Sequence, residues 1–170
     1  VANGTRIYFK NNSDAIVVFY HGNAGSACDR TFIKEKIEKL GYSYAFVEYA
    51  GYSNDTKKPS KKAILKDVEN TISFLKEKKY KKIVLISESI GGGPASYHAS
   101  IDTPDKIILI SPFNRLSDFV KNVYFFYPVR LLLTEEYDNE KWLKDYQGRV
   151  VIIHGDKDTV IPINFSKKLY

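Results

Sequence analysis

Ser89 stands two positions after Ser87, between an apolar run and three glycines, in residues 83–93, IVLISESIGGG. The pattern small-x-Ser-x-Gly, placed after a strand and before a helix, is typical of a nucleophile elbow, a sharp turn that holds its central residue in a strained conformation. Ser87, Gly91 and Gly92 supply the small side chains needed where the strand and helix backbones nearly touch. Ser89 is therefore the predicted nucleophile, at a helix N-terminus whose dipole favours developing negative charge. The alternative interpretation is a serine that only caps the helix.

The loop HGNAGS, residues 21–26, follows another apolar run and supplies a second chemical feature. Its glycines permit backbone geometries that aim N–H groups at one point. An oxyanion hole needs two such donors, and we predict the N–H of Asn23 from this loop and the N–H of Ile90, directly after the nucleophile. His21 is so close to these donors that we interpret it as a structural residue that shapes the loop.

The segment HGDKDTVIP, residues 154–162, follows the last apolar run and carries a candidate acid. Asp158 lies in the loop after the strand, where a carboxylate can orient an imidazole and stabilise its charge. Asp156 is the rival, and its alternative role is that of a turn-forming aspartate.

The elements that position these residues alternate along the chain. Continuously apolar strands separated by amphipathic helices predict a parallel sheet covered on both faces, with all strand carboxyl ends at one edge, where ligands bind. Each polar motif follows the end of such a strand, which is the first indication of function. The predicted strands are 15–22, 44–49, 82–87, 106–111 and 149–155. The predicted helices are 30–41, 59–78 and a helix from the glycines to about residue 100. In the first of these helices the predicted apolar face is formed by Phe32, Ile33, Ile37 and Leu40.

The segment 112–148 interrupts this alternation and is predicted to be a helical cap or lid inserted over the catalytic edge. Two ordinary core helices are the alternative. Its apolar residues suit an acyl chain, and together with the positive net charge they also fit docking on a membrane surface. These residues are Phe113, Phe119, Tyr124, Phe125, Phe126, Tyr127, Leu131, Leu132 and Leu133.

Length and composition limit the remaining possibilities. At 170 residues, 44% hydrophobic and 27% charged, the chain is predicted to form one domain, 1–170, that buries roughly 70% of its unfolded surface. No apolar run reaches the ~18 residues that span a bilayer. The single cysteine, Cys28, cannot form an internal disulfide, which favours a reducing, cytoplasmic location. The net charge of +6 comes largely from lysine runs flanking a helix, so a solvated face is expected rather than a nucleic-acid site.

In this order, the three motifs resemble those of the α/β-hydrolase superfamily, and HGNAG is similar to its esterase- and thioesterase-like branch. The resemblance extends over nearly the whole chain. It implies an α/β-hydrolase fold, with a mostly parallel central sheet, helices on both faces and a cap insertion. VEYAGYS, residues 47–53, is similar to the family's Asp-Tyr-Arg-Gly-Tyr-Gly loop, with Glu48 and Ala50 in place of the aspartate and arginine. By resemblance, Ser89 is the nucleophile, Asn23 and Ile90 are the oxyanion donors, and Asp158 is the acid.

The histidine that should act as base is missing from its expected place. The family order is serine, acid, histidine, yet no histidine follows Asp158. His98 is placed about two turns beyond the nucleophile, and His154 is too close to Asp158 in sequence, so neither is expected to be the base. We expect instead that the domain is incomplete at its C-terminus and that a further segment carries the histidine. A degenerate hydrolase is the alternative.

The resemblance and the motifs together predict a serine hydrolase that cleaves carboxylic esters or thioesters through an acyl-enzyme on Ser89. Its partner would be a small-molecule acyl ester or thioester, without nucleic acid, and no metal or organic cofactor is expected. A non-catalytic binding protein of the same fold and a peptidase of the superfamily are the alternatives.

Overall fold

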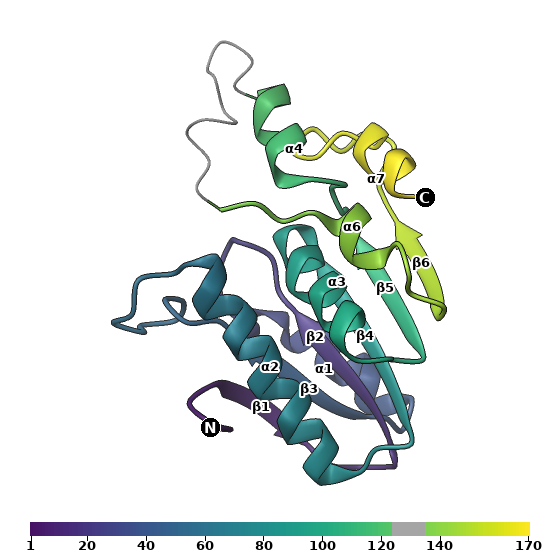
Figure 1. Ribbon diagram of the computed structural model, residues 1–170. Helices are drawn as coiled ribbons and strands as arrows, with labels where there is room; N and C mark the ends of the chain where they lie inside the picture. The colour runs from purple at the N-terminus through teal and green to yellow at the C-terminus, as the bar shows by residue number, and fades with distance from the viewer. Residues whose placement is uncertain (124–134) are drawn as a thin grey trace.

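The computed structural model describes residues 1–123 and 135–170, which form one six-stranded sheet in the order β1-β3-β2-β4-β5-β6 (Figure 1). Strand β1 runs antiparallel to β3, and all other neighbours are parallel. The predicted mostly parallel sheet is therefore confirmed. The strands are β1 (Arg6–Lys10), β2 (Ala15–Tyr20), β3 (Ser43–Glu48), β4 (Lys82–Glu88), β5 (Lys106–Ile110) and β6 (Arg149–Ile153).

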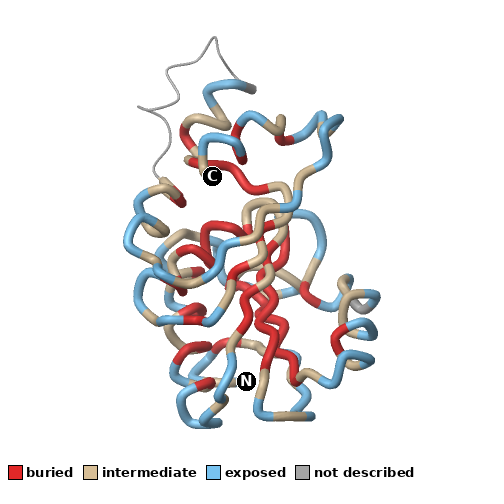
Figure 2. The backbone as a smooth tube through the Cα atoms, turned by 90° about the vertical axis from the view of Figure 1, so that its right-hand side faces the viewer, coloured by how far each residue is buried: buried red, intermediate tan, exposed pale blue. Residues whose placement is uncertain are grey.

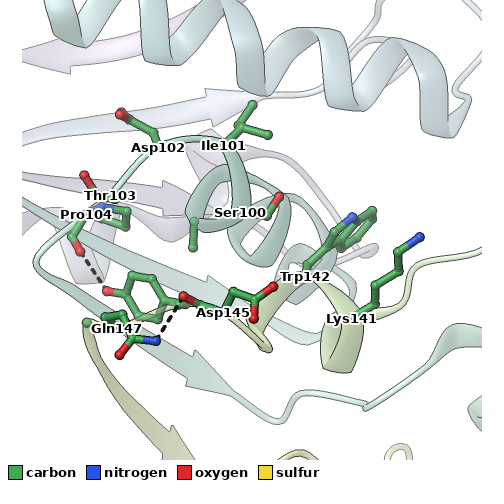
Figure 3. A pocket seen from close by; sticks show the side chains of 12 residues that line it. Ser100, Ile101, Asp102, Thr103, Pro104, Lys141, Trp142, Asp145 and Gln147 are labelled. Atoms are coloured by element: carbon green, nitrogen blue, oxygen red, sulfur yellow. Dashed lines mark hydrogen bonds between the residues drawn. The ribbon is translucent and has the colours of Figure 1, made fainter.

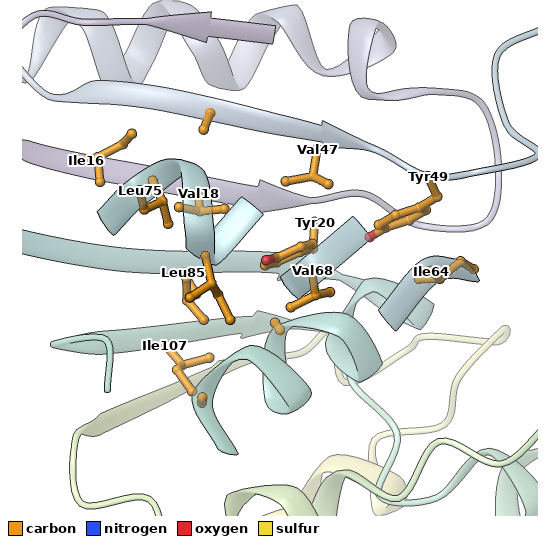
Figure 4. Packing of buried hydrophobic residues seen from close by; sticks show 14 of the residues in the cluster. Ile16, Val18, Tyr20, Val47, Tyr49, Ile64, Val68, Leu75, Leu85 and Ile107 are labelled. Atoms are coloured by element: carbon orange, nitrogen blue, oxygen red, sulfur yellow. The ribbon is translucent and has the colours of Figure 1, made fainter. Parts of the chain in front are cut away.

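Helices cover both faces of the sheet, as predicted. The sheet alternates its side chains between faces, so in β2 one set packs toward α2 and α3 and the other toward α1. Figure 4 shows the first face, where Val68 and Leu75 of α2 pack over Val18 and Leu85 of the central strands. The helical elements are η1 (Ala27–Arg30), α1 (Thr31–Lys39), α2 (Lys61–Lys78), η2 (Ser89–Gly91), α3 (Gly92–Ile101), α4 (Leu116–Val123), α6 (Asn139–Leu143) and α7 (Asn164–Leu169).

The ends of α2 show how local chemistry fixes an element. Ser60 has extended backbone angles, and its hydroxyl accepts a hydrogen bond from the Ala63 N–H at 3.2 Å, which satisfies one of the free donors of the first turn. Lys79 ends the helix in the left-handed conformation at φ 57°. The helix therefore starts two residues later than the predicted range and ends where predicted.

The predicted apolar face of α1 is wrong at two positions. Ile37 is buried and Ile33 packs against the core, but Phe32 is 58% exposed and Leu40 is 74% exposed. A nine-residue helix has room for only a narrow stripe against the sheet, so residues beside that stripe face solvent. Figure 2 shows the buried residues concentrated along the strands, with exposed residues on the outer helices.

The segment 112–148 is described in part. Helix α4 precedes residues 124–134 in the chain and helix α6 follows them (Figure 1). The predicted apolar positions Tyr124–Tyr127 and Leu131–Leu133 lie outside the described residues. Phe113 is 1% exposed and stacks on Phe119, with ring centroids 6.2 Å apart. These two rings serve packing rather than an open pocket, and the cap itself stays a prediction. In the described ranges, no helix combines the length and apolarity that a membrane crossing requires.

Candidate active site

Ser89 occupies a strained turn between β4 and α3. Its backbone φ is +53°, a left-handed value that costs a non-glycine residue about 1–3 kcal/mol and that clusters at active sites. The chain passes from β4 through the single turn of η2 into α3. This is the strand-turn-helix geometry that a nucleophile elbow requires. The Ser89 residue is half-buried, and its hydroxyl makes no hydrogen bond to the described part of the chain.

Gly91 allows the elbow to close against β2. A Cβ added at Gly91 would overlap the Tyr20 carbonyl oxygen and lie 2.7 Å from the His21 carbonyl oxygen, so no side chain fits. The same contact places Ile90 beside the start of the 21–26 loop. Gly92, in contrast, has ordinary space, with its nearest neighbour 3.5 Å away. The sequence predicted that neither position could hold a larger side chain. The contacts of an added Cβ support this prediction at Gly91 but not at Gly92.

The loop at 21–26 is held in place by buried and aromatic partners. Glu48 is 1% exposed; its carboxylate lies 3.3 Å from Nε2 of His21 and accepts the N–H of Ala27 at 3.2 Å. The Tyr52 hydroxyl donates to Oδ1 of Asn23 at 2.7 Å. The backbone N–H groups of Asn23 and Ile90 donate to no other group among the described residues. Both are therefore free to serve a developing oxyanion.

His21 shapes this loop, as expected. It is fully buried, its Nδ1 lies 2.7 Å from the Gly22 carbonyl oxygen, and its ring stacks on Tyr49 at 4.2 Å between centroids. The Tyr49 hydroxyl also donates to the His21 carbonyl at 3.0 Å. All of these contacts are structural, and none directs the imidazole toward Ser89.

Asp158 is held as a carboxylate in the loop that follows β6. Its Oδ1 accepts the N–H groups of Val160 and Ile161, both at 2.9 Å, and its Oδ2 accepts the Ser111 hydroxyl at 2.9 Å. Burial opposes ionisation, but the hydrogen bonds from Ile161, Ser111 and Val160 outweigh it and lower the pKa of the Asp158 carboxyl below its usual value. Asp158 is therefore a preoriented anion, as a triad acid must be.

Strand register places Ser89 and Asp158 at the same edge of the sheet. Glu88 pairs with Ile110 and Ile110 with Ile153, so the chain leaves β4, β5 and β6 at one level. Ser89 directly follows β4, and the loop after β6 reaches back to the end of β5, where Asp158 accepts the Ser111 hydroxyl. Among the described residues no hydrogen bond joins the Ser89 hydroxyl to the Asp158 carboxylate, and in a catalytic triad an imidazole links two such groups.

The side chains of the other two histidines, His98 and His154, also make structural contacts. His98 is fully buried, its Nδ1 lies 2.7 Å from the Tyr20 hydroxyl, and burial lowers its pKa. His154 places Nε2 2.7 Å from the Ile161 carbonyl oxygen and 3.5 Å from Oδ2 of Asp158. The bond to Ile161 ties the ends of the 154–161 loop, which carries Asp158, to each other. None of the three histidine rings hydrogen-bonds the Ser89 hydroxyl.

A cavity of about 690 Å³ lies at the far end of α3 (Figure 3). Its lining includes Asp102, Thr103, Trp142 and Asp145. Ser89 precedes the N-terminus of α3, and these residues gather at the C-terminus of that ten-residue helix, about 15 Å further along. The cavity is therefore separate from the proposed chemistry.

The family described as "Alpha/beta hydrolase of unknown function" (DUF1057) matches residues 5–119, more than half of the chain. This chain is an α/β hydrolase. The matched region includes the elbow, the 21–26 loop and the first five strands. The predicted family and fold class are thus confirmed.

Relatives of this α/β hydrolase include enzymes that act on lipids. It is 26% identical to an uncharacterized protein of Mycobacterium tuberculosis over 95% of this chain and 60% of that protein. It is 24% identical to the lysophosphatidylserine lipase ABHD12 of Mus musculus over 94% of this chain and 45% of that enzyme. The chain therefore spans about half the length of the curated relatives it matches.

Solved structures share the fold at lower sequence identity. Est1E from Butyrivibrio proteoclasticus, bound to ferulic acid, aligns with a TM-score of 0.78 and 17% identity, over 99% of this chain and 82% of that one. The Pyrococcus furiosus esterase Pf2001 aligns with a TM-score of 0.78 and 18% identity, over 98% and 70%. At these identities the likeness shows that the hydrolase fold is shared.

Sequence reasoning missed several residues that hold the site. Ser111, at φ +47°, donates its hydroxyl to Asp158; Tyr52 donates to the Asn23 side chain; and an Arg30–Glu88 ion pair joins the loop to the elbow. These partners lie far apart in sequence, so no local pattern links them. The one local signal in the sequence was the position of Glu88, which directly precedes the predicted nucleophile Ser89.

Proposed function

We propose that this α/β hydrolase cleaves carboxylic esters, including lipid esters, through an acyl-enzyme on Ser89. The observation that carries the proposal is the left-handed backbone of Ser89 at the end of β4, beside two free amides and at the same sheet edge as the Asp158 carboxylate. A strained serine in this setting matches the elbow geometry, in which strain and chemistry go together.

In the proposed reaction, Ser89 Oγ attacks the ester carbonyl carbon as its proton passes to a histidine base. The N–H groups of Asn23 and Ile90 stabilise the oxygen that becomes negative, each contributing about 3–4 kcal/mol. The C–O bond to the alcohol then breaks, and the alcohol leaves with the proton. Water, deprotonated by the same base, hydrolyses the acyl-enzyme and regenerates the serine.

The base in this proposal is a histidine contributed from outside residues 1–170. The support is that His21, His98 and His154 are each engaged in structural contacts. Asp158 would orient the incoming imidazole and stabilise its positive charge. The longer curated relatives are consistent with further residues in proteins of this type.

The proposed substrate class follows from the apolar surroundings of the elbow. Ile90 packs with a buried cluster formed by the 112–148 segment and the C-terminal part of the chain, including Phe113, Tyr137, Ile161 and Phe165. These four side chains are at most 3% exposed, so an acyl chain that follows Ile90 must displace part of this cluster. The acyl chain would then contact apolar side chains, which favour longer acyl groups by about 0.8 kcal/mol per buried CH₂. The lipase relatives are consistent with this preference. Thioesters remain within the proposed range because the same acyl-enzyme serves both.

We expect kcat/KM of the full-length protein to rise from acetyl toward medium-chain nitrophenyl esters. Each buried methylene of the acyl chain should add up to about fourfold. The measurement is initial rates on a chain-length series at one pH, with Ser89→Ala as the background. A flat or falling series would contradict the apolar acyl site, while leaving hydrolysis by Ser89 intact.

A non-catalytic binding role is the second candidate, because none of the three histidine rings hydrogen-bonds the Ser89 hydroxyl. The two candidates differ in covalent chemistry. A fluorophosphonate probe labels an activated serine, so labelling of the full-length wild type but not of Ser89→Ala supports the enzyme. Absence of labelling together with absence of turnover would support the binder.

A further inference from the structure

We propose that Arg30 and Glu88 are a positioning pair that fixes the two halves of the oxyanion hole relative to each other; this rests on the proposed function of Ser89. Neither residue touches the reacting atoms. Each acts through the backbone segment that it holds, the 21–26 loop on one side and the elbow on the other.

The pair joins the elbow and the loop with three hydrogen bonds from one guanidinium. Nε and Nη2 of Arg30 donate to the two carboxylate oxygens of Glu88 at 2.8 and 2.9 Å. Nη2 also donates to the Ala24 carbonyl at 3.1 Å. Glu88 immediately precedes Ser89, and Ala24 immediately follows Asn23. The Arg30 guanidinium therefore binds the residue next to Ser89, the predicted nucleophile, and also the residue next to Asn23, a predicted oxyanion donor.

The loop lies directly against the Glu88 side chain. A Cβ added at Gly22 would be 3.1 Å from Oε1 of Glu88, so the carboxylate packs on the loop backbone as well as pairing with Arg30. The Arg30 side chain is only 12% exposed. A two-pronged Arg–carboxylate contact of this kind adds geometric specificity as well as energy, and a lysine would not reproduce the fork.

The other side-chain contacts of the 21–26 loop do not connect the loop to the elbow. Glu48 holds His21 and Ala27 at the ends of the loop, and Tyr52 holds the Asn23 side chain. These contacts attach the loop to β3 and the segment after it. Among the described residues, Arg30 provides the side-chain link between the loop and the elbow. Asn23 and Ala24 are exposed, so the loop has little packing of its own to keep the Asn23 N–H in register with that of Ile90.

A positioning role predicts a loss in kcat rather than in KM. Oxyanion donors stabilise the transition state more than the bound ester, so displacing one of them slows chemistry without weakening substrate binding. Complete removal of one donor costs about 10²–10³ in kcat. A displaced donor retains part of its effect, so we expect a loss of about 10- to 100-fold.

The test uses the full-length protein with a nitrophenyl ester and the variants Arg30→Ala, Arg30→Lys and Glu88→Gln. We expect kcat to fall about 10- to 100-fold in each, with KM within about twofold and active enzyme counted by phosphonate titration. The double variant Arg30→Ala/Glu88→Gln should be no slower than the slower single variant, because both break one contact. Lys10→Ala is the matched control: it breaks another strand–helix ion pair, Lys10–Glu38 at 3.4 Å, and should leave kcat unchanged.

Two outcomes would overturn the pair as a positioning device. One is an unchanged kcat in Arg30→Lys and Glu88→Gln. The other is a fall in total activity that is fully explained by a smaller amount of active enzyme in the phosphonate titration, with kcat per active site unchanged. That result would indicate that the pair only stabilises the fold. If Arg30→Ala unfolds, thermal melting reveals it, and the conservative variants still decide the question. Failure of the proposed function looks different, because Ser89→Ala would then hydrolyse the ester as fast as the wild type.

Discussion

Ser89→Ala is expected to lower kcat for ester hydrolysis by about 10³-fold or more, because members of a catalytic triad act as a unit and loss of the nucleophile removes nearly all covalent catalysis. Folding should be retained. The Ser89 hydroxyl makes no hydrogen bond to the described residues, and alanine tolerates the φ of +53° about as poorly as serine does. The measurement is steady-state turnover of the full-length protein on a nitrophenyl ester, with thermal melting of both proteins.

Ser87→Ala is the matched control for this prediction. Ser87 is also a serine of the elbow motif, but its hydroxyl is buried without a hydrogen-bond partner in the described portion of the chain, and alanine keeps the small size that the position needs. We expect its turnover to stay within a few-fold of the wild type. Equal losses in the two variants would mean that serine removal disturbs the turn, not that Ser89 is the nucleophile.

Gly91→Ala is expected to destabilise the protein by about 3 kcal/mol and to abolish turnover. The added methyl group would overlap the Tyr20 carbonyl oxygen and lie 2.7 Å from that of His21. Backbone atoms at the end of a central strand cannot rotate away as a side chain can, so α3 must shift. Overpacking of this kind typically costs about 1–3 kcal/mol of stability. A shift of α3 also moves the N–H of Ile90. Denaturant unfolding and ester turnover measure the two effects.

Gly92→Ala isolates the cause of that effect. The neighbouring glycine has its nearest contact at 3.5 Å and lies in α3, where alanine is favoured over glycine by about 0.5–1 kcal/mol. We expect unchanged or slightly higher stability in this variant. If Gly91→Ala proved as stable and active as Gly92→Ala, the close packing of the elbow on β2 would be wrong.

Much of the fold was predictable because its signals are local. The five parallel strands are continuous apolar runs, and the α2 stripe repeats with helical spacing, so burial could be inferred from neighbours in sequence. Strand β1 was missed because Arg6–Lys10 is a short edge strand with mixed polarity. Phe32 and Leu40 were placed in the core because periodicity does not reveal how much of a short helix the sheet covers.

The sequence motifs indicated which residues form the candidate site, but they did not indicate the hydrogen bonds and the ion pair that hold those residues in place. The elbow, the 21–26 loop and the acid each carry a recognisable pattern, and parallel topology brings strand ends to one edge. The contacts that hold them come from residues 58, 29 and 47 positions apart in sequence, namely Arg30–Glu88, Tyr52–Asn23 and Ser111–Asp158. Such pairs depend on strand order and loop path, which no local pattern encodes.

The central claim is that Ser89 and the amides of Asn23 and Ile90 converge on one reacting carbonyl. The most direct measurement is a crystal structure of the full-length protein after reaction with a fluorophosphonate, whose tetrahedral phosphorus mimics the intermediate. We predict a bond from phosphorus to Ser89 Oγ, with the phosphoryl oxygen about 2.7–3.1 Å from both amide nitrogens. A phosphonate on another residue, or a phosphoryl oxygen out of reach of those two amides, would contradict the claim.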